Sequence, residues 1–128
     1  ALQHEMRWLE RFGLTYYGCC EPLHKKIHIL KKIPNLRKIS MSPWANKAEA
    51  AQIIGDQYVI SLKPSPALFA ADIWDPEEAQ RQLKIDLENT KGCVVEIIMK
   101  DISTCRYQPY RLWEWAKIAQ EVTEEFAF

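Results

Sequence analysis

The sequence predicts an α/β fold of four consecutive strand–helix units, which is half of a TIM-type barrel of eight such units. Short and mostly apolar runs are typical of buried parallel strands, and each is followed by apolar residues at helical spacing. Each run also ends in polar or sulfur-bearing residues, at the sheet edge where such barrels carry their active sites. The four junctions are Gly18–Pro22, Ser40–Trp44, Lys63–Pro66 and Lys100–Cys105. The pattern alone leaves an open four-stranded sheet as the alternative.

The first half of the chain predicts a helix, then a strand–helix unit, then a second strand. Residues 1–13 place Leu, Met and Phe at helical spacing, so a helix precedes the first strand. The first strand is Leu14–Gly18, and Pro22 opens a helix over Leu23–Ile33. The second strand is Arg37–Met41, a short apolar run before the second junction.

Two capping signals organise the rest of the chain. Asn46, followed three residues later by Glu49, predicts the start of a helix over Lys47–Ile54. Asp75, followed by Pro76 and two glutamates, predicts the start of a helix that runs to about Lys91. The remaining expected elements are the strands Tyr58–Leu62 and Val94–Met99 and a last helix from about Pro109 to Phe126, with a loop before Asp75.

Composition describes a single globular unit over residues 1–128, with the preceding helix at 1–13 and four units at 14–128. The 17 basic residues equal the 17 acidic ones, so charge gives no indication of a nucleic-acid partner. No apolar run approaches the roughly 20 residues of a membrane span. We therefore expect a cytoplasmic protein with reduced cysteines. The start at Ala1 without Met suggests a piece of a longer chain.

Candidate functional residues come from the four junctions. Cys19 and Cys105 follow the first and fourth strands, so their thiolates are candidate metal ligands at one edge of the sheet. The candidate third donors are Glu21, Cys20 and His24. The alternative interpretation is that these cysteines are ordinary small residues of the fold.

Two lysines and their neighbours form a second candidate set. Lys63 and Lys100 each end a strand, where a cation holds a carboxylate or phosphate, and Asp101 is the acidic residue beside them. A simple ion pair between Lys100 and Asp101 is the alternative. Side chains that would line a pocket for a cofactor or substrate are Tyr17, Ser42 and Trp44.

The junctions resemble the C-terminal half of the uroporphyrinogen decarboxylase superfamily, which includes cobalamin-dependent methyltransferases. The resemblance extends from Leu14 to the end of the chain and rests on the segments 16–22, 39–45, 60–67 and 98–105. It implies an eight-unit barrel, of which this chain is the last four units. The remainder of that barrel is then its first expected partner.

The resemblance implies a zinc-dependent methyltransferase that activates a thiol acceptor, with the corrinoid supplied by a partner protein. Cys19 and Cys105 match the family's two zinc-binding cysteines, whereas the family's histidine position is Tyr17 here. A tetrapyrrole decarboxylase is the alternative, although its late histidine is replaced by Thr104-Cys105. A non-catalytic half-barrel that binds a partner is the third possibility.

An isolated half-barrel has consequences of its own. Four strands leave two open edges, and we expect an apolar inner face formed by residues such as Val59, Val95 and Ile97. Such edges and patches predict self-association of the chain into a symmetric dimer. Half of a barrel's catalytic groups would be missing, so we expect no turnover by this chain alone.

Overall fold

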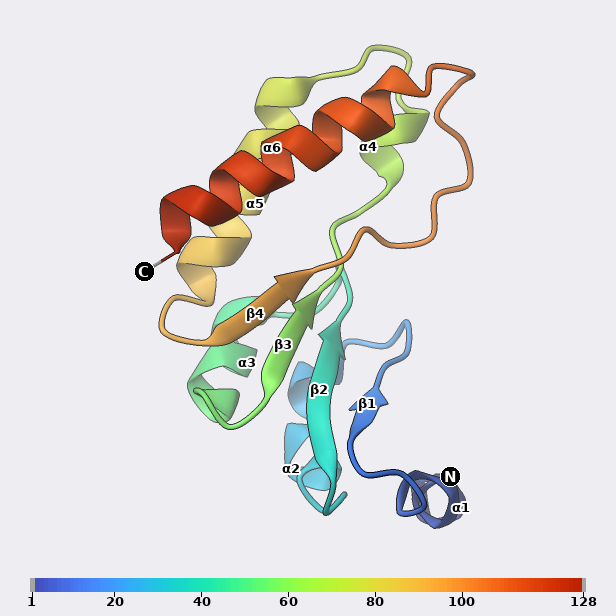
Figure 1. Cartoon of the computed structure of the whole chain (residues 1–128), viewed down its shortest axis with the longest axis vertical. Coiled ribbons are helices and arrows are strands. Elements are labelled where there is room, and N and C mark those ends of the chain that lie inside the picture. Colours follow the sequence, from blue (N-terminus) through green and yellow to red (C-terminus); the bar gives the residue numbers. More distant parts are fainter. Residues whose placement is uncertain (1, 128) are drawn as a thin grey trace.

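The computed structural model describes residues 2–127 and contains one parallel sheet in the order β1-β2-β3-β4 (Figure 1). Every neighbouring pair of strands is parallel, which confirms the alternating α/β fold. The strands are β1 (Thr15–Tyr17), β2 (Leu36–Met41), β3 (Val59–Leu62) and β4 (Val94–Ile97). The helices are α1 (Leu2–Leu9), the 3-10 turn η1 (Leu23–Lys25), α2 (Ile27–Leu30), α3 (Lys47–Ile54), α4 (Ala67–Ala70), α5 (Pro76–Asn89) and α6 (Tyr110–Phe126).

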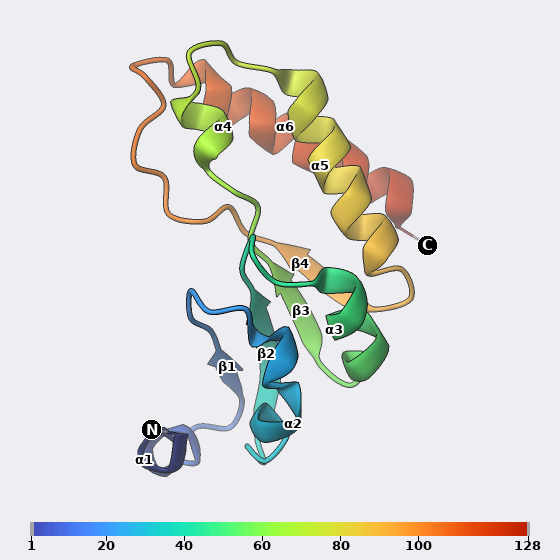
Figure 2. The same cartoon turned by 180° about the vertical axis from the view of Figure 1, so that it is seen from behind.

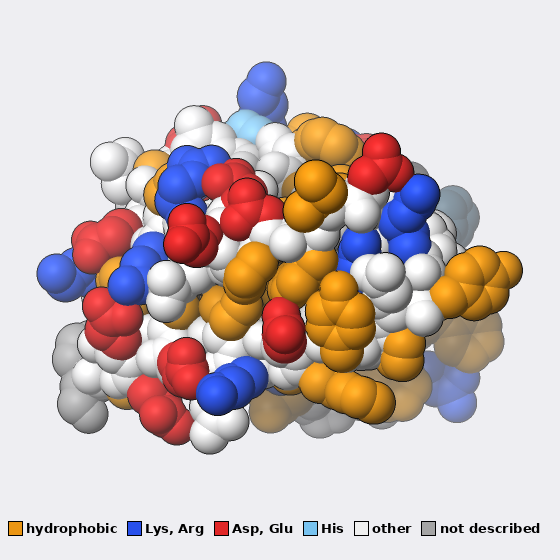
Figure 3. Space-filling model, turned by 90° about the horizontal axis from the view of Figure 1, so that it is seen from above, with side chains coloured by type: hydrophobic (Ala, Val, Ile, Leu, Met, Phe, Trp, Pro, Cys, Tyr) orange, Lys and Arg blue, Asp and Glu red, His pale blue; other side chains and the backbone are white. Residues whose placement is uncertain are grey.

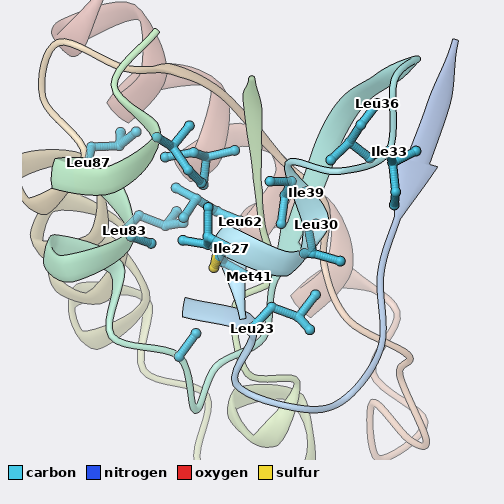
Figure 4. Packing of buried hydrophobic residues seen from close by; sticks show 14 of the residues in the cluster. Leu23, Ile27, Leu30, Ile33, Leu36, Ile39, Met41, Leu62, Leu83 and Leu87 are labelled. Carbon is cyan, nitrogen blue, oxygen red and sulfur yellow. The ribbon is translucent and has the colours of Figure 1, made fainter. Parts of the chain in front are cut away.

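The hydrophobic core lies between the sheet and the helices on one of its sides. Helices α2 and α3 lie in front of the sheet in Figure 2 and behind it in Figure 1. Leu23, Ile27 and Leu30 point inward as their spacing predicts, and they meet Ile39 and Leu62 of the central strands (Figure 4). These side chains are nearly inaccessible to water, so their burial supplies most of the driving force for docking the helices.

Both predicted helix caps are present. The side chain of Asn46 accepts a hydrogen bond from the Glu49 amide at 3.0 Å, and α3 begins at the next residue. Asp75 accepts from the Glu78 amide at 3.1 Å at the start of α5. Each cap satisfies one of the amides that a helix N-terminus leaves without a partner.

Several elements differ from the sequence prediction. Helix α1 ends at Leu9 rather than residue 13, and β1 is Thr15–Tyr17 rather than Leu14–Gly18. The helix expected over Leu23–Ile33 is broken at Lys26, whose φ of −115° and ψ of 5° separate η1 from α2. Strand β4 ends at Ile97 rather than Met99. The loop before Asp75 contains the single helical turn α4, which buries Phe69 completely.

The face of the sheet opposite the helices is polar. Tyr16, Lys38, Ser40, Ser61 and Glu96 alternate with the core residues of their strands, so they lie on this second face. No helix covers β1–β3 on this side, which faces the viewer in Figure 1.

The sequence predicted an apolar inner face, and this prediction is wrong. Val95 and Ile97 pack against the core on the helix side, and of the three expected residues only Val59 shares the face of Ser61. The period-two alternation of each strand forces this assignment, because the registers align Val95 with the core residue Ile60.

Within residues 2–127 the sheet is open, since β1 and β4 each pair with one neighbour only. A hollow of about 600 Å³ lies beside β4 and the ends of α5 and α6, and Val95, Ile97 and Phe126 contribute to its lining.

No helix of the described residues is long and apolar enough to cross a membrane. Figure 3 shows the protein from above the view of Figure 1. Acidic and basic side chains are interleaved there beside several neighbouring hydrophobic side chains, so the face in that view carries no large patch of a single charge.

Candidate functional site

The ends of all four strands meet at one cleft of about 420 Å³. Five of the residues predicted from the junctions line it together: Cys19, Ser42, Lys63, Lys100 and Asp101. The parallel order of the strands explains this convergence, because their carboxyl ends share one edge of the sheet. The remaining lining residues are Tyr16, Gly18, Ser40, Ile98 and Met99.

The two lysines of the cleft have no acidic partner among residues 2–127. No carboxylate lies within 4.0 Å of the Nζ atom of Lys63 or Lys100, so the ion pair considered between Lys100 and Asp101 is not formed. Lys100 Nζ instead lies 3.6 Å from the sulfur of Cys20. Lys63 Nζ lies 5.4 Å from the centre of the Tyr16 ring. Two half-buried cations are thus available to an anionic group in the cleft.

Tyr16 is a residue of the cleft that the sequence analysis did not select. Its hydroxyl donates a hydrogen bond to Ser61 Oγ at 2.8 Å, and its ring stays 43% exposed beside the cleft. Burial raises the pKa of Tyr16, but hydrogen bonding with Lys63, Ser61 and Ser40 and the charge of Lys63 outweigh it, so the pKa is lower than usual. The anionic form of Tyr16 is therefore more accessible than that of an isolated tyrosine.

A polar row extends from Tyr16 across the sheet. Ser40, Ser61 and Glu96 occupy paired positions on β2, β3 and β4, which puts them side by side on one face. Lys38 Nζ closes the row with an ion pair to Glu96 at 2.7 Å. Hydrogen bonding with Lys38 lowers the pKa of the Glu96 carboxyl, against an opposing effect of burial, and Ser61 lowers it further.

Ser42 is the buried hydroxyl of the cleft. Its side chain is 2% exposed, and its Oγ has no hydrogen-bond partner among the described residues. A buried hydroxyl without a partner is costly unless something else satisfies it. Because Ser42 lines the cleft, a bound polar group is positioned to do so.

Gly18 allows β1 to come close to β2 at the mouth of the cleft. A Cβ atom at this position would lie 2.9 Å from Ser40 Cβ and 3.8 Å from the Tyr16 ring. The absence of a side chain at Gly18 therefore leaves the room that Ser40 and the Tyr16 ring occupy on either side of it.

The predicted metal ligands are distributed rather than gathered. Cys19 lines the cleft and is exposed, as is Cys20, whereas the half-buried Cys105 is not among the lining residues. Within residues 2–127, no three side chains of His, Cys, Asp or Glu form a group able to hold a metal ion. The residues as arranged therefore do not fit a three-ligand zinc site.

Each predicted third donor already has a partner in the protein. Glu21 forms an ion pair with Lys26, and Cys20 accepts from Lys100. His24 is buried, and its Nδ1 accepts a hydrogen bond from the Asn46 amide at 3.1 Å. This contact ties His24 to the start of α3, which is a structural role.

Tyr17 and Trp44 do not line the cleft. The Tyr17 hydroxyl donates to Glu5 of α1 at 2.9 Å, on the helix side of the sheet. Burial, reinforced by Glu5, raises the pKa of Tyr17 to about 12, so this phenol stays protonated. Trp44 is 72% exposed and lines a separate hollow beside Pro66 and Thr104.

Comparisons with models of protein families, with curated proteins and with solved structures found no match to this chain. The residues of the cleft and the four strand-end segments are therefore what indicate a function. The alternating parallel fold permits many chemistries, so only the site discriminates between them.

Proposed function

We propose that the chain is the C-terminal half of an eight-stranded barrel enzyme similar to the uroporphyrinogen decarboxylase superfamily. Supporting features are the all-parallel order of the four strands and the free edges of β1 and β4. The hollow lined by Val95, Ile97 and the ends of α5 and α6 also lies beside β4, one of the two edge strands. In this proposal the remainder of the barrel pairs with both edges and completes the cleft.

The proposed reaction is transfer of a methyl group to a thiol acceptor, with the methyl donor a corrinoid carried by a partner protein. The observation that carries it is the convergence of Cys19, Ser42, Lys63, Lys100 and Asp101 from all four junctions in one cleft. These positions belong to the segments that resemble the superfamily. The cleft offers cations and hydroxyls to orient an acceptor that also bears an anionic group.

The test uses the complete barrel protein that carries this chain, supplied with methylcobalamin and a series of simple thiols. We expect thiol-dependent loss of the methyl–cobalt absorption, and a strong decrease in its rate in Lys63→Met. Trp113→Phe is the matched control, because Trp113 is exposed on α6 and lines neither the cleft nor the hollow beside it. Retention of methylcobalamin with every thiol, in a protein that is folded, would contradict the proposed reaction.

Zinc binding stays a prediction of the resemblance. It would require Cys19 and Cys105 to act together with Glu21, Cys20 or His24, each of which has another partner here. Elemental analysis of the protein purified without chelator measures it directly. If zinc is bound as the resemblance implies, it should be lost in Cys19→Ser and in Cys105→Ser but kept in Cys93→Ser, whose thiol packs against the core. Zinc content unaffected by the first two substitutions refutes this ligand assignment.

A tetrapyrrole decarboxylase is the second candidate, and the two lysines without acidic partners favour it. Lys63 and Lys100 would bind carboxylates of the substrate, whose charge they neutralise. Release of CO₂ from a carboxylated tetrapyrrole, lost in Lys63→Met and Lys100→Met, distinguishes this activity from methyl transfer.

A further inference from the structure

We propose that Tyr16 is the acid–base group of the cleft and that Ser61 and Lys63 set its protonation. The inference rests on the proposed function, since it assigns a residue to the thiol acceptor's proton. Tyr16 lines the cleft together with Lys63, and its hydroxyl is fixed at 2.8 Å from Ser61 Oγ. No metal ligand is involved, and the three side chains come from β1, from β3 and from the residue that follows β3.

The geometry meets the two requirements of a proton-transferring phenol. The first is access, which the 43% exposure of Tyr16 on the cleft wall provides. The second is a fixed orientation, which the completely buried Ser61 provides by accepting the hydroxyl's hydrogen bond. A positioned group that meets both requirements contributes on the order of 10²–10⁴ to the rate of a proton transfer.

The charges around Tyr16 stabilise its anionic form relative to that of an isolated tyrosine. The titratable groups that face it from the packed elements and the cleft are Lys38 of β2, Lys63 after β3, Glu96 of β4, Cys19 after β1, and Lys100 and Asp101 after β4. Lys38 and Glu96 neutralise each other in an ion pair. Lys63 has no carboxylate partner among residues 2–127, and its charge lowers the pKa of Tyr16.

The proton transfer balances without any further reactant. The Tyr16 phenolate takes the proton of the acceptor thiol, so the S–H bond breaks, an O–H bond forms, and the electron pair stays on sulfur. The thiolate is the nucleophile that attacks the methyl group. The phenol then returns the proton to solvent through the open side of the cleft, which restores the phenolate.

The test is a spectroscopic pH titration of tyrosinate absorption on the 128-residue chain without substrate. The chain contains five tyrosines, so the wild type gives overlapping steps, and the assignment comes from the variants. We expect Tyr16→Phe to lose the step at lowest pH and Lys63→Met to move that step to higher pH. Tyr107→Phe is the matched control, because Tyr107 is fully exposed away from the cleft, and it should keep the step.

The two possible failures are distinguishable. If the earliest step survives unchanged in a folded Tyr16→Phe chain, or is insensitive to Lys63→Met, the assignment of Tyr16 is overturned whatever the reaction proves to be. If Tyr16→Phe does not fold, as judged by circular dichroism, the shift in Lys63→Met decides the question. If Tyr16→Phe loses the step as expected but the complete protein methylates no thiol, the proposed reaction is wrong, whereas the assignment of Tyr16 as the titrating group is supported.

Discussion

Arg111 is the largest fully buried side chain of the protein, and its removal should destabilise the fold strongly. It is 1% exposed, and its guanidinium donates to the carbonyl oxygens of Phe69 at 2.9 Å, Ala71 at 2.7 Å and Asp72 at 3.1 Å. Its Nε also donates to Gln108 at 2.9 Å. One side chain of α6 thus holds the backbone of the α4 segment, which has no strand or long helix of its own.

The magnitude follows from what each carbonyl loses in Arg111→Met. The Phe69 carbonyl is buried and would be left without a partner, at a cost of about 1–3 kcal/mol. Ala71 and Asp72 are exposed residues, so their carbonyls regain water and contribute little. Loss of a charged donor adds to this, whereas relief of the guanidinium's own desolvation subtracts from it. We therefore expect a decrease of about 2–3 kcal/mol in the free energy of unfolding.

Urea unfolding followed by tryptophan fluorescence measures this change. The rings of Trp74 and Phe69 are stacked with their centres 5.6 Å apart, and the Trp115 ring meets Phe69 edge-on at 6.3 Å between centres. Two of the tryptophans therefore report on the surroundings of Phe69, whose carbonyl Arg111 binds. Arg106→Met is the matched control, because its ion pair with Asp72 is exposed and should contribute only about 0–1 kcal/mol. An equal effect of the two substitutions would refute the claim that the buried clamp stabilises α4.

Two further predictions concern the polar face. Gly18→Ala should cost roughly 1–3 kcal/mol, because its Cβ would lie 2.9 Å from Ser40 Cβ; Gly13→Ala, with nothing within 4 Å, is the control in the same urea assay. Lys38 lowers the pKa of Glu96, so their pair stabilises the fold above the ordinary glutamate pKa, and this stabilisation is lost as pH falls through the lowered value. Urea midpoints between pH 6 and pH 3 should therefore fall less steeply in Lys38→Met than in wild type or Lys38→Arg, and an identical pH dependence would contradict the role of this pair.

Local signals in the sequence predicted the elements that depend on few residues. The Asn46 and Asp75 caps each need one side chain and one amide nearby, so both helix starts are found where the sequence indicates. The break at Lys26 could not be predicted in the same way. Leu23, Ile27 and Leu30 face the core whether their helix is continuous or broken, and the pattern therefore fixes the buried face and not the continuity. The single turn α4 is too short to show any periodicity.

The strand-end argument predicted Cys19, Ser42, Lys63, Lys100 and Asp101 as members of one site, and the structure brings them to one cleft. Tyr16, Ser40 and Ser61 were not selected as site residues, because they lie inside strands that were interpreted as mostly apolar. The signal was present in the alternation of polar and apolar residues over segments 38–42 and 60–63. Alternation of this kind indicates one apolar face and one polar face, because successive side chains point to opposite sides of a strand.

In the proposed barrel this polar face would line the interior, and its composition favours a functional interior over a purely structural one. The interior of a barrel is usually filled by bulky branched apolar side chains, which stabilise it without any polar partner. Here the middle of that face holds the buried Ser40 and Ser61 and the half-buried Glu96. Ser61 accepts a hydrogen bond from Tyr16, and Glu96 pairs with Lys38, which offsets the cost of placing polar groups there. The row is incomplete within residues 2–127, since Ser42 Oγ and Glu96 Oε1 are buried without partners. An apolar row would have been the more stable solution, so the presence of this network favours a ligand or proton that the cleft handles.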